Sequence, residues 1–207
     1  MKMTMDERSS LLKIVNTLLN AGLAAALDDE KAKYGLYDWY RKAGLRDLGI
    51  SYADGATKVV FIDSELDWVI KVNLRDATRD YCAREYENYC LAEEAGLGYY
   101  FAACDFLAEI DGITFYAQEY VECDDSVDST IYESLRASYE EEGSEYSDED
   151  LWCESQEIDG YDRVMVLYGN LELAKFVEEH HINDLHCGNF GIAGDHYVMI
   201  DYSGYGF

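Results

Sequence analysis

The chain has 207 residues, of which 49% are hydrophobic and 14% aromatic, so it is long enough and apolar enough to bury a core. It carries 43 acidic against 16 basic residues, a formal net charge of -27, and no proline. This charge argues against direct nucleic-acid binding, which requires a basic surface to neutralise phosphates. Uninterrupted apolar runs stay well below the roughly 18 residues of a membrane span, so we expect a cytoplasmic protein without membrane association.

The first predicted element is an amphipathic helix over residues 5–27, where leucine and valine recur at spacings of three and four. Three short β-type runs separated by turn residues follow, at 48–52, 58–62 and 68–72. A helix is predicted over 79–95, ending at Gly96. Two more strands, 104–110 and 114–121, are joined by the turn Asp111-Gly112. Short strands of this kind predict an antiparallel sheet.

Residues 122–159 differ in composition, with 15 acidic residues and one basic residue, Arg136. Because like charges repel and extend a chain, we expect a solvated, mobile insertion, and the alternative is a functional acidic surface. A helix over 163–180 and a strand pair complete the chain. The expected domains are a helical extension, a sheet region, the acidic insertion and a C-terminal region, over 1–46, 47–121, 122–160 and 161–207.

Three oxygen-bearing side chains follow the last predicted helix. Asp184 comes first, Asn189 lies five residues later, and Asp201 follows the β-type run 197–200. Phosphoryl transfer uses one carboxylate to orient the attacking hydroxyl, and an amide with a second carboxylate to hold magnesium. The pattern therefore predicts Asp184 as a catalytic residue and Asn189 and Asp201 as metal ligands.

A lysine lies in the middle of the predicted strand 68–72. Burying the Lys71 ammonium without a partner would cost several kcal/mol. The next helix offers Glu85 as the best partner, with Glu87 as the second choice. We therefore expect an ion pair between Lys71 and Glu85.

Together these motifs resemble the protein kinases over residues 47–205. V-I-K at 69–71 is similar to their strand-three lysine motif, and D-L-H-C-G-N at 184–189 resembles the catalytic loop of aminoglycoside phosphotransferases. I-D-Y-S-G at 200–204 is similar to the magnesium-binding D-F-G segment. Q-E-Y-V at 118–121 lies where the hinge that binds adenine would be, with Glu119 and Val121 as its contact residues. The resemblance implies an α+β, minimal protein-kinase-like bilobal fold, with an antiparallel N-lobe sheet, one helix and a truncated helical C-lobe.

The resemblance also implies function. It predicts an ATP- and magnesium-dependent phosphotransferase in which Lys71 binds phosphates and Glu85 orients it. A degenerate pseudokinase stays open, because residues 53–58 hold one glycine where kinases have three, and six residues follow Asp201. The I-D-Y-S-G-Y ending resembles those of small kinase-like proteins of bacteriophages and mobile elements, so we expect the protein to act in the cytoplasm of a bacterial host cell.

A second hypothesis starts from the charge. A strongly acidic protein of this kind can imitate DNA and occupy the basic nucleic-acid channel of a host defence protein, such as a Cas effector, as an anti-CRISPR-like inhibitor would. The partner is then a basic host protein surface instead of a nucleotide.

Overall fold

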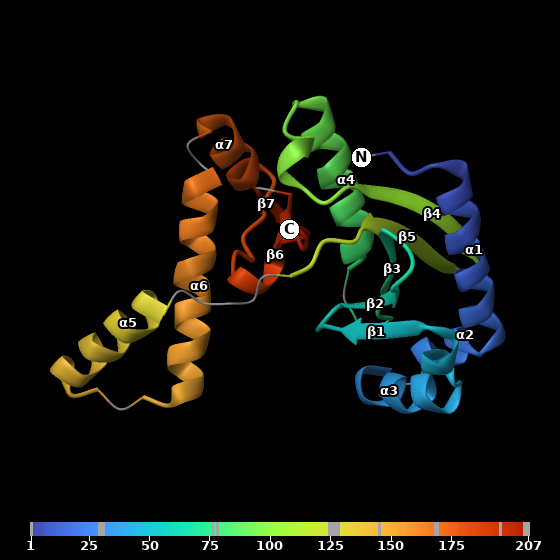
Figure 1. Ribbon diagram of the computed structural model, residues 1–207, viewed down its shortest axis with the longest axis horizontal. Coiled ribbons are helices and arrows are strands. Elements are labelled where there is room, and N and C mark those ends of the chain that lie inside the picture. The colour runs from blue at the N-terminus through green and yellow to red at the C-terminus, as the bar shows by residue number, and fades with distance from the viewer. Residues whose placement is uncertain are drawn as a thin grey trace. The chain divides into compact units, whose positions relative to one another are not determined.

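The computed structural model describes residues 2–28, 32–75, 77, 79–123, 129–144, 146–167, 170–194 and 196–204, without the side chains of 32–34, 159–167 and 187. Within these residues the chain has an α+β fold with a five-stranded antiparallel sheet, seven α-helices and a small β-hairpin (Figure 1). It divides into two compact units, the first formed by Met1–Cys90 and Ala103–Tyr120, the second by Leu91–Ala102 and Val121–Phe207. Within the described ranges, no helix is both long and apolar enough to span a membrane.

The sheet of the first unit has the order β1-β2-β3-β5-β4. Its strands are β1 (Ile50–Asp54), β2 (Lys58–Asp63), β3 (Trp68–Asn73), β4 (Cys104–Ile110) and β5 (Ile113–Glu119). The predicted antiparallel sheet is thus confirmed, and β1 starts two residues late because residues 45–48 form a 3-10 turn, η1 (Leu45–Leu48). The β4–β5 turn has positive φ at both Asp111 (54°) and Gly112 (73°), as a type I′ hairpin requires.

Strand alternation gives the sheet two unlike faces. From the register, one face carries only apolar residues at its centre, among them Phe61, Ile70 and Phe115. The other face carries Lys58 and Lys71 together with Asn73, Tyr116 and Gln118. The two faces therefore require different covering elements.

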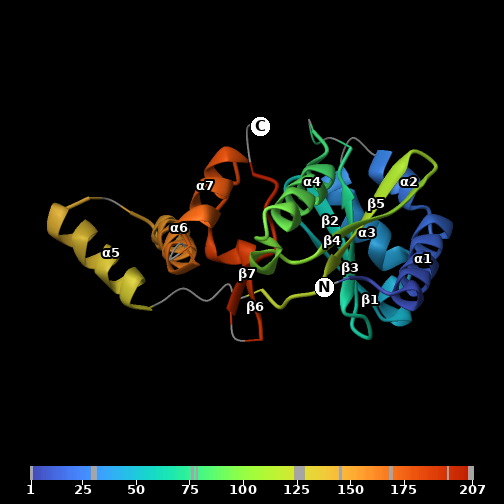
Figure 2. The same ribbon diagram turned by 90° about the horizontal axis from the view of Figure 1, so that it is seen from above.

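Three N-terminal helices cover the apolar face: α1 (Met5–Asn20), α2 (Leu23–Asp28) and α3 (Ala32–Lys42). Trp39 packs its ring edge on Phe61 at 6.2 Å between centroids, and α1 lies along β3 and β4. The predicted single helix over 5–27 is divided into α1 and α2, because Gly22 has a left-handed φ of 88° that ends the first helix. Figure 2 shows α4 (Tyr81–Glu94), preceding the short turn η2 (Gly98–Tyr100), on the opposite side of the sheet.

An arginine ties α1 to the sheet edge. The register of β4 shifts between Phe106 and Ala108, which is a β-bulge. The Arg8 guanidinium donates hydrogen bonds to the carbonyls of Phe106 (3.0 Å) and Leu107 (2.6 Å). These bonds satisfy backbone oxygens at the bulge and fix the start of α1 there.

In the second unit, α5 (Ser129–Glu142), α6 (Asp148–Leu167) and α7 (Leu171–Glu179) precede the turn η3 (Cys187–Asn189) and the hairpin of β6 (Phe190–Ala193) and β7 (His196–Met199). The segment 122–159 was expected to be extended by charge repulsion. This prediction is wrong for residues 129–142 and 148–159, which are helical. Ser147 and Asp150 form a capping box that starts α6, and Leu151 and Ser155, one turn apart, are buried. Residues 124–128 and 145 lie outside the described part of this segment.

The predicted helix 163–180 is found as the end of α6 and a separate α7. The Asn170 side chain accepts a hydrogen bond from the Glu172 amide at 3.0 Å, which starts α7 anew. Residues 168 and 169, inside that predicted helix, lie outside the described residues.

Candidate functional site

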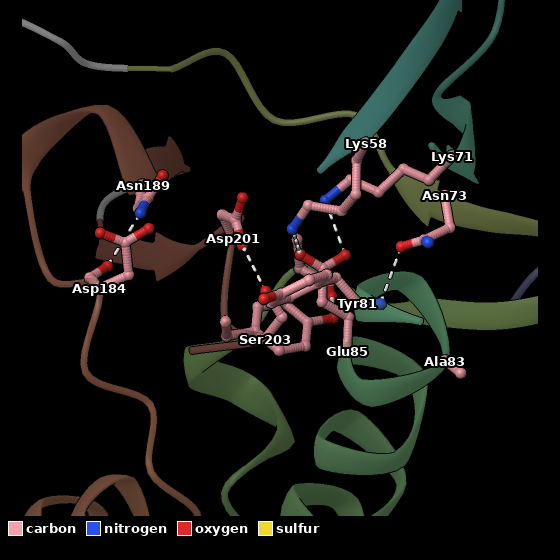
Figure 3. Close-up of polar contacts among 12 residues, drawn as sticks. Lys58, Lys71, Asn73, Tyr81, Ala83, Glu85, Asp184, Asn189, Asp201 and Ser203 are labelled. Carbon is pink, nitrogen blue, oxygen red and sulfur yellow. Dashed lines mark hydrogen bonds and ion pairs between the residues drawn. The ribbon is translucent and has the colours of Figure 1, made fainter. Parts of the chain in front are cut away.

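In the first unit, Asn73 connects the end of β3 to the start of α4. Its Oδ1 accepts from the Tyr81 amide at 2.8 Å and its Nδ2 donates to the Arg79 carbonyl at 3.0 Å. Asp80 accepts from the Ala83 amide at 2.9 Å, which satisfies another free donor of the first helical turn. These bonds fix α4 at its N-terminal end, one turn before Glu85 (Figure 3).

The Glu85 carboxylate forms ion pairs with two lysine side chains. Lys71 Nζ lies 2.9 Å from Glu85 Oε2, and Lys58 Nζ lies 2.6 Å from Glu85 Oε1. The three residues are buried, with exposed fractions of 5%, 7% and 0% for Lys71, Lys58 and Glu85. The predicted ion pair between Lys71 and Glu85 is therefore present. Glu87, the second choice, is exposed and pairs with Arg84 at 3.6 Å.

Burial of such charges requires close pairing, because each ion loses several kcal/mol of hydration in a protein interior. Here each carboxylate oxygen of Glu85 faces one ammonium group, so every member of the cluster has a close partner of opposite sign. The field of the cluster extends to Cys82, whose thiol pKa is raised well above its usual value by burial and by the nearby Glu85 carboxylate. Cys82 is therefore held as a neutral thiol.

Lys58 was missed from the sequence. The signal was available in the β2–β3 register, where Lys71 lies opposite Val60 and Lys58 lies two residues further on the same face. Diagonal neighbours of this kind are close enough for long side chains to meet the same partner. Without the register, Lys58 reads as a solvated residue beside a turn.

The predicted hinge residues lie at the boundary of the units. Glu119 is the last residue of β5, and its Oε2 accepts from the Ala103 amide at 3.2 Å. Val121 belongs to the second unit, where its side chain packs against Gly191 of β6. A Cβ on Gly191 would lie 2.6 Å from the Val121 side chain and from the Glu122 carbonyl, so glycine is needed for this contact.

In the second unit, Asp184 and Asn189 are joined through the loop between α7 and β6. Asn189 is buried, and its Nδ2 donates to the Asp184 carbonyl at 2.8 Å. His186 Nε2 lies 3.7 Å from Asp184 Oδ1, and the His186 carbonyl accepts from the Asn189 amide at 2.9 Å. The loop is thus closed on itself, and the side-chain oxygen of Asn189 is turned away from the Asp184 carbonyl.

Asp201 is brought to this loop by its neighbours. Ile200 N donates to the Asn189 carbonyl at 2.9 Å, and Tyr202 is fully buried with its hydroxyl donating to the Ala102 carbonyl at 2.7 Å. Asp201 Oδ1 accepts from the Ser203 hydroxyl at 3.2 Å. The structure therefore gathers Asp184, Asn189 and Asp201 in one region of the second unit (Figure 3).

Gly204 lets the chain after Asp201 pass close to the backbone of His181. Gly204 has a φ of 70°, and a Cβ there would lie 2.0 Å from the His181 carbonyl oxygen. His181 itself has a positive φ of 54°. The tight approach of these two backbone segments fixes the path of the chain just after Asp201.

The donor set suits a hard divalent cation. Carboxylate and amide oxygens are the ligands that magnesium prefers, and the predicted metal ligands Asp201 and Asn189 are one of each type. No known protein family matches the chain by its family model, and no curated protein matches it in sequence.

Proposed function

We propose that the protein is a minimal kinase-like phosphotransferase that uses ATP and magnesium. The observation that carries this proposal is the buried ion pair between Lys71 and Glu85. An ion pair buried this deeply does not by itself stabilise a fold relative to apolar residues, so its presence favours a functional use of the lysine.

In the proposed reaction, Asp184 orients the acceptor hydroxyl and takes its proton as the hydroxyl oxygen attacks the γ-phosphorus. The bond between the γ-phosphorus and the bridging oxygen breaks, and ADP leaves. Asn189 and Asp201 would hold magnesium, which would neutralise charge on the phosphates when bound. Glu119 and Val121 contact the adenine.

Lys58 offers a second cationic group for phosphate binding, which matters because the loop between β1 and β2 has a single glycine where kinases have three. The amide of Gly55 donates to the Lys58 carbonyl at 3.0 Å, so it is engaged within the hairpin. In the proposed site the ammonium groups of Lys58 and Lys71 bind the nucleotide phosphates in place of a glycine-rich backbone cradle. Glu85 then positions both lysines.

Titration calorimetry with ATP and magnesium tests the proposal. We expect magnesium-dependent binding, weakened roughly tenfold or more by Asp201→Asn or Lys71→Met, because each removes a charge-assisted contact. Asp111→Asn, the same change in an exposed turn, serves as the matched control and leaves binding unchanged.

Transfer to an acceptor then separates the active enzyme from a pseudokinase that binds ATP without turnover. Absence of magnesium-dependent nucleotide binding would refute the proposal and leave the acidic-inhibitor hypothesis in its place.

A further inference from the structure

A groove lies between α5 and α6 in the second unit. It has a volume of about 550 Å³ and is lined by Ser129, Tyr132 and Glu133 of α5 and by Asp148, Glu149 and Trp152 of α6. Trp152 is 44% exposed, which is unusual for the largest apolar side chain. These six residues form what we call the aromatic-acidic groove.

The helix on one side of the groove has little cover. No residue of α5 is fully buried, although Ile131, Tyr132, Leu135 and Tyr139 form an apolar stripe at helical spacing. The Tyr139 hydroxyl donates to Glu154 of α6 at 2.6 Å, which holds the two helices together. A second hollow of about 390 Å³, lined in part by Leu135 and Ile158, lies along the same helix pair. Apolar surface on α5 and α6 therefore remains available to a partner.

The rim of the groove is negative. Glu133, Asp148 and Glu149 line it, and among the described residues no basic side chain forms an ion pair with any of the three. Arg136, the one basic residue of α5, pairs with Glu140 at 3.2 Å. The three carboxylates thus share the groove with two aromatic rings, and within the described residues no basic side chain forms an ion pair with them.

We propose that the aromatic-acidic groove binds a basic amphipathic segment of a partner protein. An arginine or lysine of the segment packs on the Trp152 ring while the carboxylates accept its hydrogen bonds, and apolar side chains of the segment cover the neighbouring surface of α5 and α6. A metal ion is a poorer occupant, because the aromatic rings of Tyr132 and Trp152, one from each helix, supply no hard oxygen ligands.

This inference does not rest on the proposed phosphotransfer, because none of the groove residues takes part in it. The helix α6 also contacts η3, the turn that ends at Asn189. A partner in the groove would therefore bind to a helix that supports the Asn189 loop.

Fluorescence anisotropy with a labelled helical peptide tests the inference. The probe carries arginine and leucine at a spacing of four, and its counterpart has glutamine in place of each arginine. At roughly 150 mM salt, where general charge attraction is screened, we expect the arginine peptide to bind and its counterpart not to bind. The triple variant Glu133→Gln, Asp148→Asn, Glu149→Gln should weaken binding roughly tenfold or more.

A matched variant distinguishes the groove from the charge of the whole chain. Glu141→Gln, Glu142→Gln and Glu157→Gln remove the same number of charges from exposed positions of α5 and α6 outside the groove, and should weaken binding less than about threefold. Equal weakening by both triple variants would overturn the inference in favour of general attraction to an acidic protein.

A measurement on the unchanged protein guards against misfolded variants. The three tryptophans each give an indole N–H signal in a ¹H–¹⁵N NMR spectrum, and Trp152→Phe identifies the signal of Trp152. Addition of the arginine peptide should shift this signal and leave those of the other two in place. An unmoved Trp152 signal with a bound peptide would also overturn the inference.

Discussion

Replacing Glu85 by glutamine should destabilise the first unit more than replacing either lysine that it binds. The two ion pairs at 2.6 and 2.9 Å share this one carboxylate, and its side chain is 0% exposed. Glu85→Gln leaves two buried ammonium groups facing a neutral amide, and loss of one member of a buried ion pair costs about 3–5 kcal/mol. For a chain of this size that corresponds to a fall in Tm of about 10 °C.

Lys71→Met should cost less. Methionine keeps most of the aliphatic stem, and Glu85 retains Lys58 at 2.6 Å. The lost charge-assisted hydrogen bond is worth about 1.5–3 kcal/mol. The expected order of destabilisation is therefore Glu85→Gln first and Lys71→Met second, with Glu87→Gln within about 0.5 kcal/mol of the wild type because Glu87 is exposed.

Urea unfolding followed by tryptophan fluorescence measures this order. Trp39 and Trp68 lie in the first unit and Trp152 in the second, so a Trp152→Phe background makes the signal specific to the first unit. This matters because the two units need not unfold together. If Glu85→Gln cost no more than Lys71→Met, the carboxylate would not be the shared centre of the cluster and the reasoning would be refuted.

Other predictions concern the backbone, the bulge and a helix cap. Gly204→Ala should lower the Tm at least twice as much as Gly96→Ala, because both have positive φ but only Gly204 also meets a carbonyl oxygen, and equal losses would contradict the packing. Arg8→Lys should cost about 1–2 kcal/mol in urea unfolding, since lysine cannot bridge two bulge carbonyls as a guanidinium does, and an unchanged midpoint would exclude that role. Hydrogen bonds from Thr4 lower the pKa of Glu7, so the cap stabilises α1 above the usual carboxyl pKa of about 4.3 and is lost as the pH falls through the lowered value. Circular dichroism should show helix loss in acid that Thr4→Ala reduces.

Much of the sheet could be predicted from local sequence. Alternating β-branched and aromatic residues identify each strand, and Asp111-Gly112 supplies the left-handed residues that a type I′ turn needs. The partner of Lys71 was also predictable, because an ammonium group in an apolar strand requires a carboxylate nearby. The chain offered Glu85 and Glu87 on the next helix, and helical geometry with the Asn73 contacts selected Glu85.

Other features depended on contacts between residues distant in the sequence. Lys58 joins the buried cluster because the β2–β3 register brings it to the same face as Lys71, and register is a property of the paired strands. The acidic segment was expected to be extended because its charges repel, yet the capping box at Ser147 and the burial of Leu151 stabilise helix there. The local sequence pattern thus determined where the strands lie. Tertiary packing decided which charged groups are buried together, because the cost of burying a charge is offset only by partners that folding brings into contact.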